Sequence, residues 1–215
     1  MFWNPLTRRL LFVHLPFLIV FFLFAFNFTI KPIKAQSAVN EQYAVYSALL
    51  NEAYNLRKVK NLPVTLLLIQ NNTKHLLMDL EEEKWEGKGV KKNSIAYSPQ
   101  FREAVEDYKS KKEPQIIENS LKSEADYLLI KQEELDSLLK RDNSVFKDWE
   151  AFQRKFPKSG GYYVFSRVGF NSEMTHAFVY VSFACGDMCG KGSYKLLIKE
   201  NGVWKVKETI HLFVA

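Results

Sequence analysis

The last quarter of the chain, residues 161–215, consists almost entirely of strand pattern broken by short turns, and this constrains the fold more than any other feature. Its first ten residues are rich in aromatic and β-branched side chains, which suit a pleated, half-buried surface. Residues 176–184 are apolar on both faces, as in a strand that is buried on both sides. Apolar residues and lysines alternate over 194–199, and residues 203–214 form a last strand. The pattern predicts a four-stranded antiparallel meander.

The turn at Asn201-Gly202 sets the register of the last two strands. Because a slip of one residue reverses every side chain of a strand, a two-residue turn would place Ile198 opposite Lys205 and mix apolar with polar surfaces. A three-residue loop, 200–202, instead pairs Ile198 with Trp204, and Gly202 supplies the left-handed residue that it needs. We therefore predict the three-residue loop. With Glu208 as the exception, the alternation of the last strand puts its apolar side chains on a single face: Trp204, Val206, Ile210, Leu212 and Val214.

Residues 1–35 have the features of a targeting segment. Arg8 and Arg9 form a basic start, and Leu10–Ile30 carries no formal charge. A cleavage site follows Ala35, but the apolar run exceeds the about 7–15 residues of a usual signal-peptide core and reaches the length of a membrane span. We predict a cleaved signal peptide, with a retained N-terminal membrane anchor as the alternative. Both place residues 36–215, as a single domain, outside the cytoplasm: secreted, periplasmic or membrane-anchored.

The charge of the chain belongs largely to that segment. The whole sequence has 30 basic and 24 acidic residues, a net charge of +6. Four of the basic residues lie within residues 1–35, with no acidic residue beside them, so the remainder is close to neutral. No basic stripe with interleaved aromatic residues is present, which argues against nucleic-acid binding. Membrane contact is expected only through residues 1–35, if they are not removed.

The middle of the chain indicates helices with short strands between them. Helical spacing predicts an amphipathic helix over 39–55 whose core-facing residues are Val39, Tyr43, Tyr46, Leu50 and Ala53. Ser98 as N-cap and Pro99 at the first helical position begin a helix with Phe101, Val105 and Tyr108 on one face. Further elements are strands at 64–70 and 127–131 and helices at 133–140 and 144–156, while residues 71–97 indicate a solvated loop. Helices before strands predict an α+β fold, with helices covering one face of a mostly antiparallel sheet.

Cys185 and Cys189 are the only cysteines, three residues apart in a glycine-rich segment that we expect to be a loop between strands. In an exported protein this spacing favours a structural disulfide that closes the loop. A redox-active pair is less favoured, because thiol oxidoreductases usually place C-x-x-C at a helix N-terminus. A metal site is also disfavoured, since zinc needs four ligands and only His176 or Asp187 lies close in sequence.

No sequence motif indicates catalysis. The chain has no nucleophile elbow, zinc-protease helix, phosphate-binding loop or dinucleotide fingerprint, so we predict no catalytic residue, cofactor or metal. Arg167 is the most unusual charge, because it lies among apolar strand residues and a buried arginine needs a partner. We interpret it as half of an ion pair with Glu208 or Glu173. The alternative is an anion-binding group in a cavity between the sheet and the helices.

Several segments resemble a group of uncharacterised exported bacterial proteins that end in a similar meander. The segments are S-R-V-G-F-N (166–171), A-F-V-Y-V (177–181), C-G-D-M-C-G-K-G (185–192) and G-V-W-K-V (202–206), after a helix end with Trp149, Phe152, Phe156 and Pro157. The group has no assigned activity, so the resemblance implies export and a common fold but transfers no functional residue. A curved sheet wrapped on helices is also similar to the cystatin-like and NTF2-like folds, an analogy that implies no function.

Two functions are compatible with these features. The first is a non-enzymatic envelope or secreted domain that binds a protein or peptide partner through its sheet. The second is a small-ligand-binding or hydrolytic domain that uses a pocket on the concave face, with Arg167, Tyr163 and His211 as its polar groups. An open pocket lined by these three residues would favour the second function, and a filled sheet face would favour the first. The sequence does not identify the ligand, the partner or the oligomeric state.

Overall fold

The structure, a computed structural model, describes residues 15–60, 66–76, 85, 90–91, 93–139 and 149–215, with side chains from residue 36 onward. The chain separates into two compact units, residues 1–40 and 41–215. Helix α1 (Leu15–Val59) contributes to both. The predicted targeting segment, residues 1–35, lies outside the residues whose side chains are described. No helix among the described residues is both long and apolar enough to cross a membrane.

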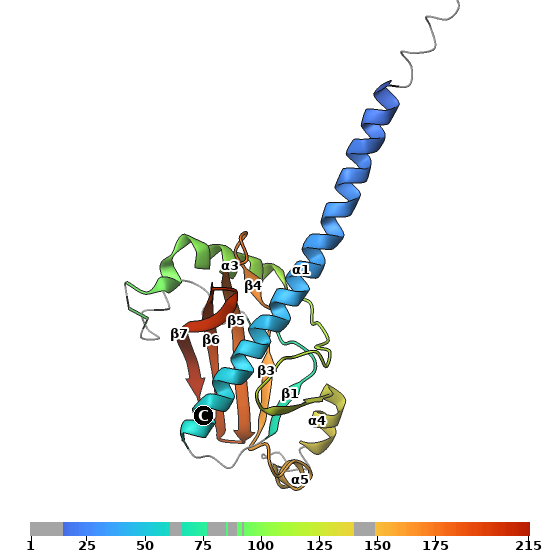
Figure 1. The fold of residues 1–215 in the computed structure, drawn as a ribbon. Coiled ribbons are helices and arrows are strands. Elements are labelled where there is room, and N and C mark those ends of the chain that lie inside the picture. The colour runs from blue at the N-terminus through green and yellow to red at the C-terminus, as the bar shows by residue number, and fades with distance from the viewer. Residues whose placement is uncertain (1–14, 61–65, 77–84, 86–89, 92, 140–148) are drawn as a thin grey trace, which may run out of the picture. The chain divides into compact units, whose positions relative to one another are not determined.

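Among the described residues of the second unit, seven strands form one mixed, mostly antiparallel sheet (Figure 1). Six of them lie in the order β2-β1-β3-β5-β6-β7, and β4 pairs with β5. The pairs β1-β2 and β1-β3 are parallel, and the other pairs are antiparallel. The strands are β1 (Leu66–Gln70), β2 (Asp126–Ile130), β3 (Tyr162–Phe165), β4 (Gly169–Phe170), β5 (His176–Gly186), β6 (Cys189–Glu200) and β7 (Val203–Val214). The α+β class and the C-terminal antiparallel meander are confirmed.

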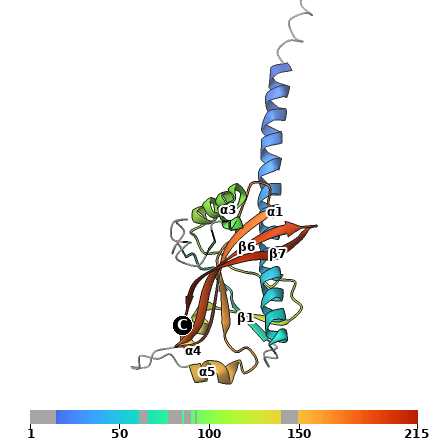
Figure 2. The same cartoon turned by 90° about the vertical axis from the view of Figure 1, so that its left-hand side faces the viewer.

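Helices cover both faces of the sheet, where the sequence had indicated one. Figure 2 shows the part of α1 from Glu41 onward on one side and α3 (Pro99–Ser110) on the other. The side of α3 also carries α4 (Gln132–Leu138) and α5 (Trp149–Lys155), and a short 3-10 helix, η3 (Ile95–Tyr97), precedes α3. Ser98 caps α3 as predicted, since its hydroxyl accepts a hydrogen bond from the backbone N–H of Phe101 at 3.4 Å.

Three apolar cores follow from this layering in the described part of the chain, and one of them lies under α4 and α5, where Leu135 and Phe152 pack with Leu68. Under α1, Tyr46 and Leu50 pack against Phe165 and Leu197. Under α3, the buried cluster includes Phe101, Tyr108, Phe178 and Tyr194. The α1 stripe agrees with prediction near its centre, but Val39 remains 38% exposed. In the predicted loop 71–97, Lys91 is exposed, whereas Trp85 is only 1% exposed and contacts Tyr97.

The predicted three-residue loop between β6 and β7 is wrong. Ile198 pairs with Lys205 and Lys199 with Trp204, so the turn has two residues. Asn201 and Gly202 have φ of 50° and 80°, the left-handed pair of a type I′ turn. The pairing is tolerated because α1 covers this face. Glu41 of α1 accepts hydrogen bonds from Lys199 Nζ at 2.6 Å and from Trp204 Nε1 at 2.7 Å.

The last strand also changes faces along its length, contrary to the prediction. Leu196 pairs with Glu208 but Leu197 pairs with Val206, so Lys207 is the extra residue of a β-bulge. Trp204 and Val206 therefore pack in the core under α1, while Ile210 and Leu212 belong to the core under α3. The bulge brings Thr209 and His211 to the α1 side, where they line the pocket described below.

The cysteine segment is the tip of a hairpin instead of an open glycine-rich loop. Strand β5 continues through Gly186, which pairs with Cys189 at the start of β6, so only residues 187–188 form the turn. Cys185 and Cys189 are joined by a disulfide with a Cα–Cα separation of 5.0 Å, as predicted. The bond therefore clamps two neighbouring strands at the end where they meet.

Candidate functional site

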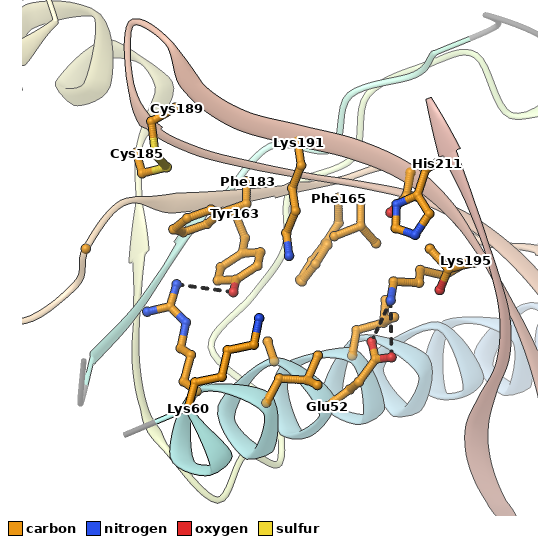
Figure 3. Close-up of a pocket in the computed structure, with 18 residues that line it drawn as sticks. Glu52, Lys60, Tyr163, Phe165, Phe183, Cys185, Cys189, Lys191, Lys195 and His211 are labelled. Carbon is orange, nitrogen blue, oxygen red and sulfur yellow. Dashed lines mark hydrogen bonds and ion pairs between the residues drawn. A yellow bond between two sulfur atoms is a disulfide. The ribbon is translucent and has the colours of Figure 1, made fainter. Parts of the chain in front are cut away.

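A cavity of about 370 Å³ lies between the C-terminal part of α1 and strands β3, β5, β6 and β7 (Figure 3). Every residue that lines it belongs to the second compact unit. Its volume falls within the roughly 300–1,000 Å³ that small-molecule sites usually occupy. We call this cavity the α1–sheet pocket. Its lining residues are Leu49, Glu52, Ala53, Leu56, Arg57, Lys60, Gly160, Tyr163, Phe165, Val181, Phe183, Cys185, Cys189, Lys191, Ser193, Lys195, Thr209 and His211.

The walls of the pocket are mainly apolar. Tyr163 and Phe165 of β3 and Phe183 of β5 present aromatic rings to it, and Leu56 of α1 also lines it. Leu56 is 51% exposed, so an apolar side chain at the pocket remains accessible to solvent. Burial of such surface is worth about 25 cal/mol per Å², which favours an apolar ligand that covers it.

Four cationic side chains line the same pocket, against one carboxylate. Arg57 and Lys60 come from the end of α1, and Lys191 and Lys195 come from β6. The carboxylate, Glu52, pairs with Lys195, whose Nζ lies 2.9 and 3.1 Å from the two carboxylate oxygens. The charge of Lys195 is thus balanced within the protein, and three cations remain.

Arg57 has a structural role that explains its position. Only 8% of the residue is exposed. Its guanidinium donates to the backbone carbonyl of Ser159 at 3.1 Å and to the Tyr163 hydroxyl at 3.2 Å, and it lies 4.9 Å from the centre of the Phe183 ring. These contacts fasten the end of α1 to the start of β3. Burial raises the pKa of Tyr163, and the positive charge of Arg57 opposes that rise.

Of the four pocket cations, Lys60 and Lys191 are the two without a side-chain partner among the described residues. The structure gives neither ammonium group a hydrogen bond or ion pair to any residue that it describes. Although Lys191 is an exposed residue, Figure 3 shows its ammonium group pointing into the pocket toward Lys60. Desolvation lowers the pKa of Lys191, and repulsion from Lys195, Lys60 and Arg57 lowers it further, while Glu52 acts in the opposite direction.

The structure brings together two of the three predicted binding residues. Tyr163 and His211 both line the α1–sheet pocket, whereas Arg167 does not. Arg167 lies in the break between β3 and β4, close enough to the Tyr46 hydroxyl to oppose the rise in its pKa that burial causes. Its Nε is buried and has no hydrogen-bond partner in the part of the chain that the structure describes. The predicted ion pair with Glu208 or Glu173 is not present among the described residues, since Glu208 instead accepts from the Ser94 hydroxyl at 2.6 Å.

Sequence reasoning missed the cationic groups of the pocket. The alternation of Lys195 and Lys199 with apolar residues indicated a solvent face, but α1 lies over that face and its acidic residues pair with both lysines. The signal that could have located the site is Glu41 and Glu52 on the helix, eleven residues apart and so about three turns along one face. Acidic residues on a helix that faces lysines on a strand indicate packing between the two.

The disulfide forms one end of the pocket, and its loss has a defined expected cost. Replacing both Cys185 and Cys189 by serine should lower the free energy of unfolding by less than the about 3 kcal/mol estimated for a 15-residue loop, because the closed loop is much shorter. Urea unfolding measures this change. Thiol titration of the denatured, unreduced protein should find no free thiol, and two free thiols would contradict the structural disulfide.

The described residues contain no cluster of three or more histidine, cysteine or acidic side chains that could hold a metal ion. Comparison with protein-family models, curated proteins and solved structures finds no match to this chain. The kinship with exported bacterial proteins stays a prediction.

Proposed function

We propose that this chain is a non-enzymatic, extracytoplasmic protein that binds a small ligand in the α1–sheet pocket. The observation that carries the proposal is the cavity of about 370 Å³ with aromatic and aliphatic walls. Pockets of this size and lining bury most of a small molecule while a few polar groups orient it. The Cys185–Cys189 disulfide and the predicted targeting segment support an oxidising location outside the cytoplasm.

Binding is better supported than hydrolysis. Ser193, Thr209 and His211 all line the pocket, but the structure shows no hydrogen bond between His211 and either hydroxyl among the residues that it describes. A nucleophile activated by a base requires such a contact. Binding of a partner through an open sheet face is less favoured as well, because helices cover both faces over much of the sheet.

Filling the pocket should abolish binding of an apolar probe. N-phenyl-1-naphthylamine, an uncharged dye whose fluorescence rises in apolar surroundings, should bind the protein saturably at one site. Ala53→Trp and Leu56→Trp place a large ring in the pocket and should lose this binding. Asn55→Trp, on the same helix but outside the lining, should retain it.

Two outcomes would contradict the proposed function. One is the absence of saturable dye binding to the wild-type protein. The other is dye affinity in both Ala53→Trp and Leu56→Trp equal to that of the wild type. Circular dichroism must show that these two variants and the Asn55→Trp control are folded. The use of two filling positions matters because Ala53 packs in the core, whereas Leu56 is half exposed and tolerates a larger side chain.

A further inference from the structure

The α1–sheet pocket combines an apolar interior with an excess of positive charge, and these two features point to one class of ligand. Glu52 balances Lys195, and protein acceptors satisfy Arg57 in part. Lys60 and Lys191 approach from opposite sides, one from the end of α1 and one from β6 (Figure 3). Two ammonium groups that face each other without an acceptor repel, and an anion between them would remove that repulsion.

The two lysines differ in whether the fold itself gives a reason for their positive charge. Lys60 follows the last turn of α1, where the helix dipole favours a cation, so its charge has a structural reason. Lys191 has no helix dipole to stabilise its charge. It is on a strand, the structure gives its ammonium no acceptor among the described residues, and three other cations surround it. Lys191 is therefore the pocket lysine to which the described residues supply neither an acceptor nor a helix dipole.

We propose that the ligand is an amphipathic carboxylate, an alkyl or aryl chain that ends in one carboxyl group. Its carboxylate lies between Lys60 and Lys191, and its apolar chain covers Phe165, Phe183 and Leu56. This deepens the proposed function and rests on it. The apolar walls favour a single small head group, because a larger polar ligand would leave its other polar groups without partners against aromatic rings. Charge-assisted hydrogen bonds from two ammonium groups supply the orientation.

The test compares ligands that share a chain and differ only in their head group. Decanoate, decanol and decylamine each compete with N-phenyl-1-naphthylamine, at concentrations below those at which they form micelles. Decanoate should bind at least about tenfold more tightly than decanol, since hydrogen bonds to a charged group are stronger than those between neutral groups. Decylamine should bind most weakly, because its cation meets the unpaired lysines.

Matched variants separate charge from shape. Lys191→Gln should weaken decanoate binding about tenfold and leave decanol binding unchanged. Lys205→Gln makes the same chemical change at an exposed lysine of β7 that does not line the pocket, and it should alter neither. Lys60→Gln should act in the same direction as Lys191→Gln.

Each contrary result has a distinct meaning. Equal binding of decanoate, decanol and decylamine would overturn the carboxylate assignment and leave the pocket as a binding site. No competition by any of them, together with no saturable dye binding, would overturn the proposed function as well. If Lys191→Gln weakened decanol as much as decanoate, the lysine would have a structural role. Tighter binding of decyl phosphate than of decanoate would identify a phosphate head group and overturn the choice of carboxylate.

Discussion

Replacing Gly169 by alanine is expected to lower the free energy of unfolding by about 3 kcal/mol or more. Gly169 begins β4, which packs closely against α3. A Cβ atom added there would lie 2.1 Å from the carbonyl oxygen of Ala104 and 2.5 Å from the amide nitrogen of Tyr108. Both are backbone atoms of α3, so no side-chain rotation relieves the clash. The strand and the helix must separate, although Asp107 holds them together by accepting from the Phe170 N–H at 2.7 Å.

Gly202→Ala provides the control for this substitution. Gly202 has φ of 80°, and an added Cβ atom has nothing within 4 Å, so its cost is only that of the left-handed backbone, about 1–2 kcal/mol. Urea unfolding monitored by tryptophan fluorescence measures both changes. A Gly169→Ala protein no less stable than Gly202→Ala would show that β4 does not contact α3 as the structure places it.

Phe178→Ala is expected to destabilise the protein by about 3–5 kcal/mol, the usual cost of removing a buried phenylalanine ring. Phe178 is fully buried under α3. Its ring centre lies 4.7 Å from that of Tyr194 and 5.3 Å from that of Tyr108, so both tyrosine rings lose a contact when it is removed. The cavity left between sheet and helix cannot close easily, because strands β5 and β6 are fixed by their neighbours on both sides.

The matched control is Phe213→Ala, the same truncation at a residue of the edge strand β7 that is 41% exposed. It should cost well under half as much, since the ring already contacts solvent. Because Phe178 and the α1–sheet pocket lie on opposite faces of the sheet, dye binding by Phe178→Ala provides a second test. Phe178 is not part of the α1–sheet pocket, so Phe178→Ala should still bind N-phenyl-1-naphthylamine under conditions in which it is folded. Equal destabilisation by the two substitutions would contradict the core under α3.

Local signals in the sequence were sufficient for most of the secondary structure. The N-cap at Ser98, the aromatic and β-branched composition of β3 and β5, and the spacing of the α1 stripe each depend on residues that are neighbours in the chain. The disulfide was predictable for the same reason, since Cys185 and Cys189 lie four positions apart and need only a tight turn to meet. The Asn201-Gly202 pair also carried the correct turn, because both residues accept positive φ.

Contacts between distant segments decided the remainder. A three-residue turn would be favoured if one face of the last hairpin met water and if side chains alternated along β7 without interruption. Neither holds, because α1 covers the lysine face and the bulge at Lys207 exchanges the faces of β7. The pocket depends on the same contacts, because it lies between the end of α1 and strands β3, β5, β6 and β7. Its two lysines without a partner among the described residues, Lys60 and Lys191, are 131 positions apart in the chain. Sequence patterns report the period of a single element, whereas a pocket is the space left between elements, and its size depends on packing that no single segment encodes.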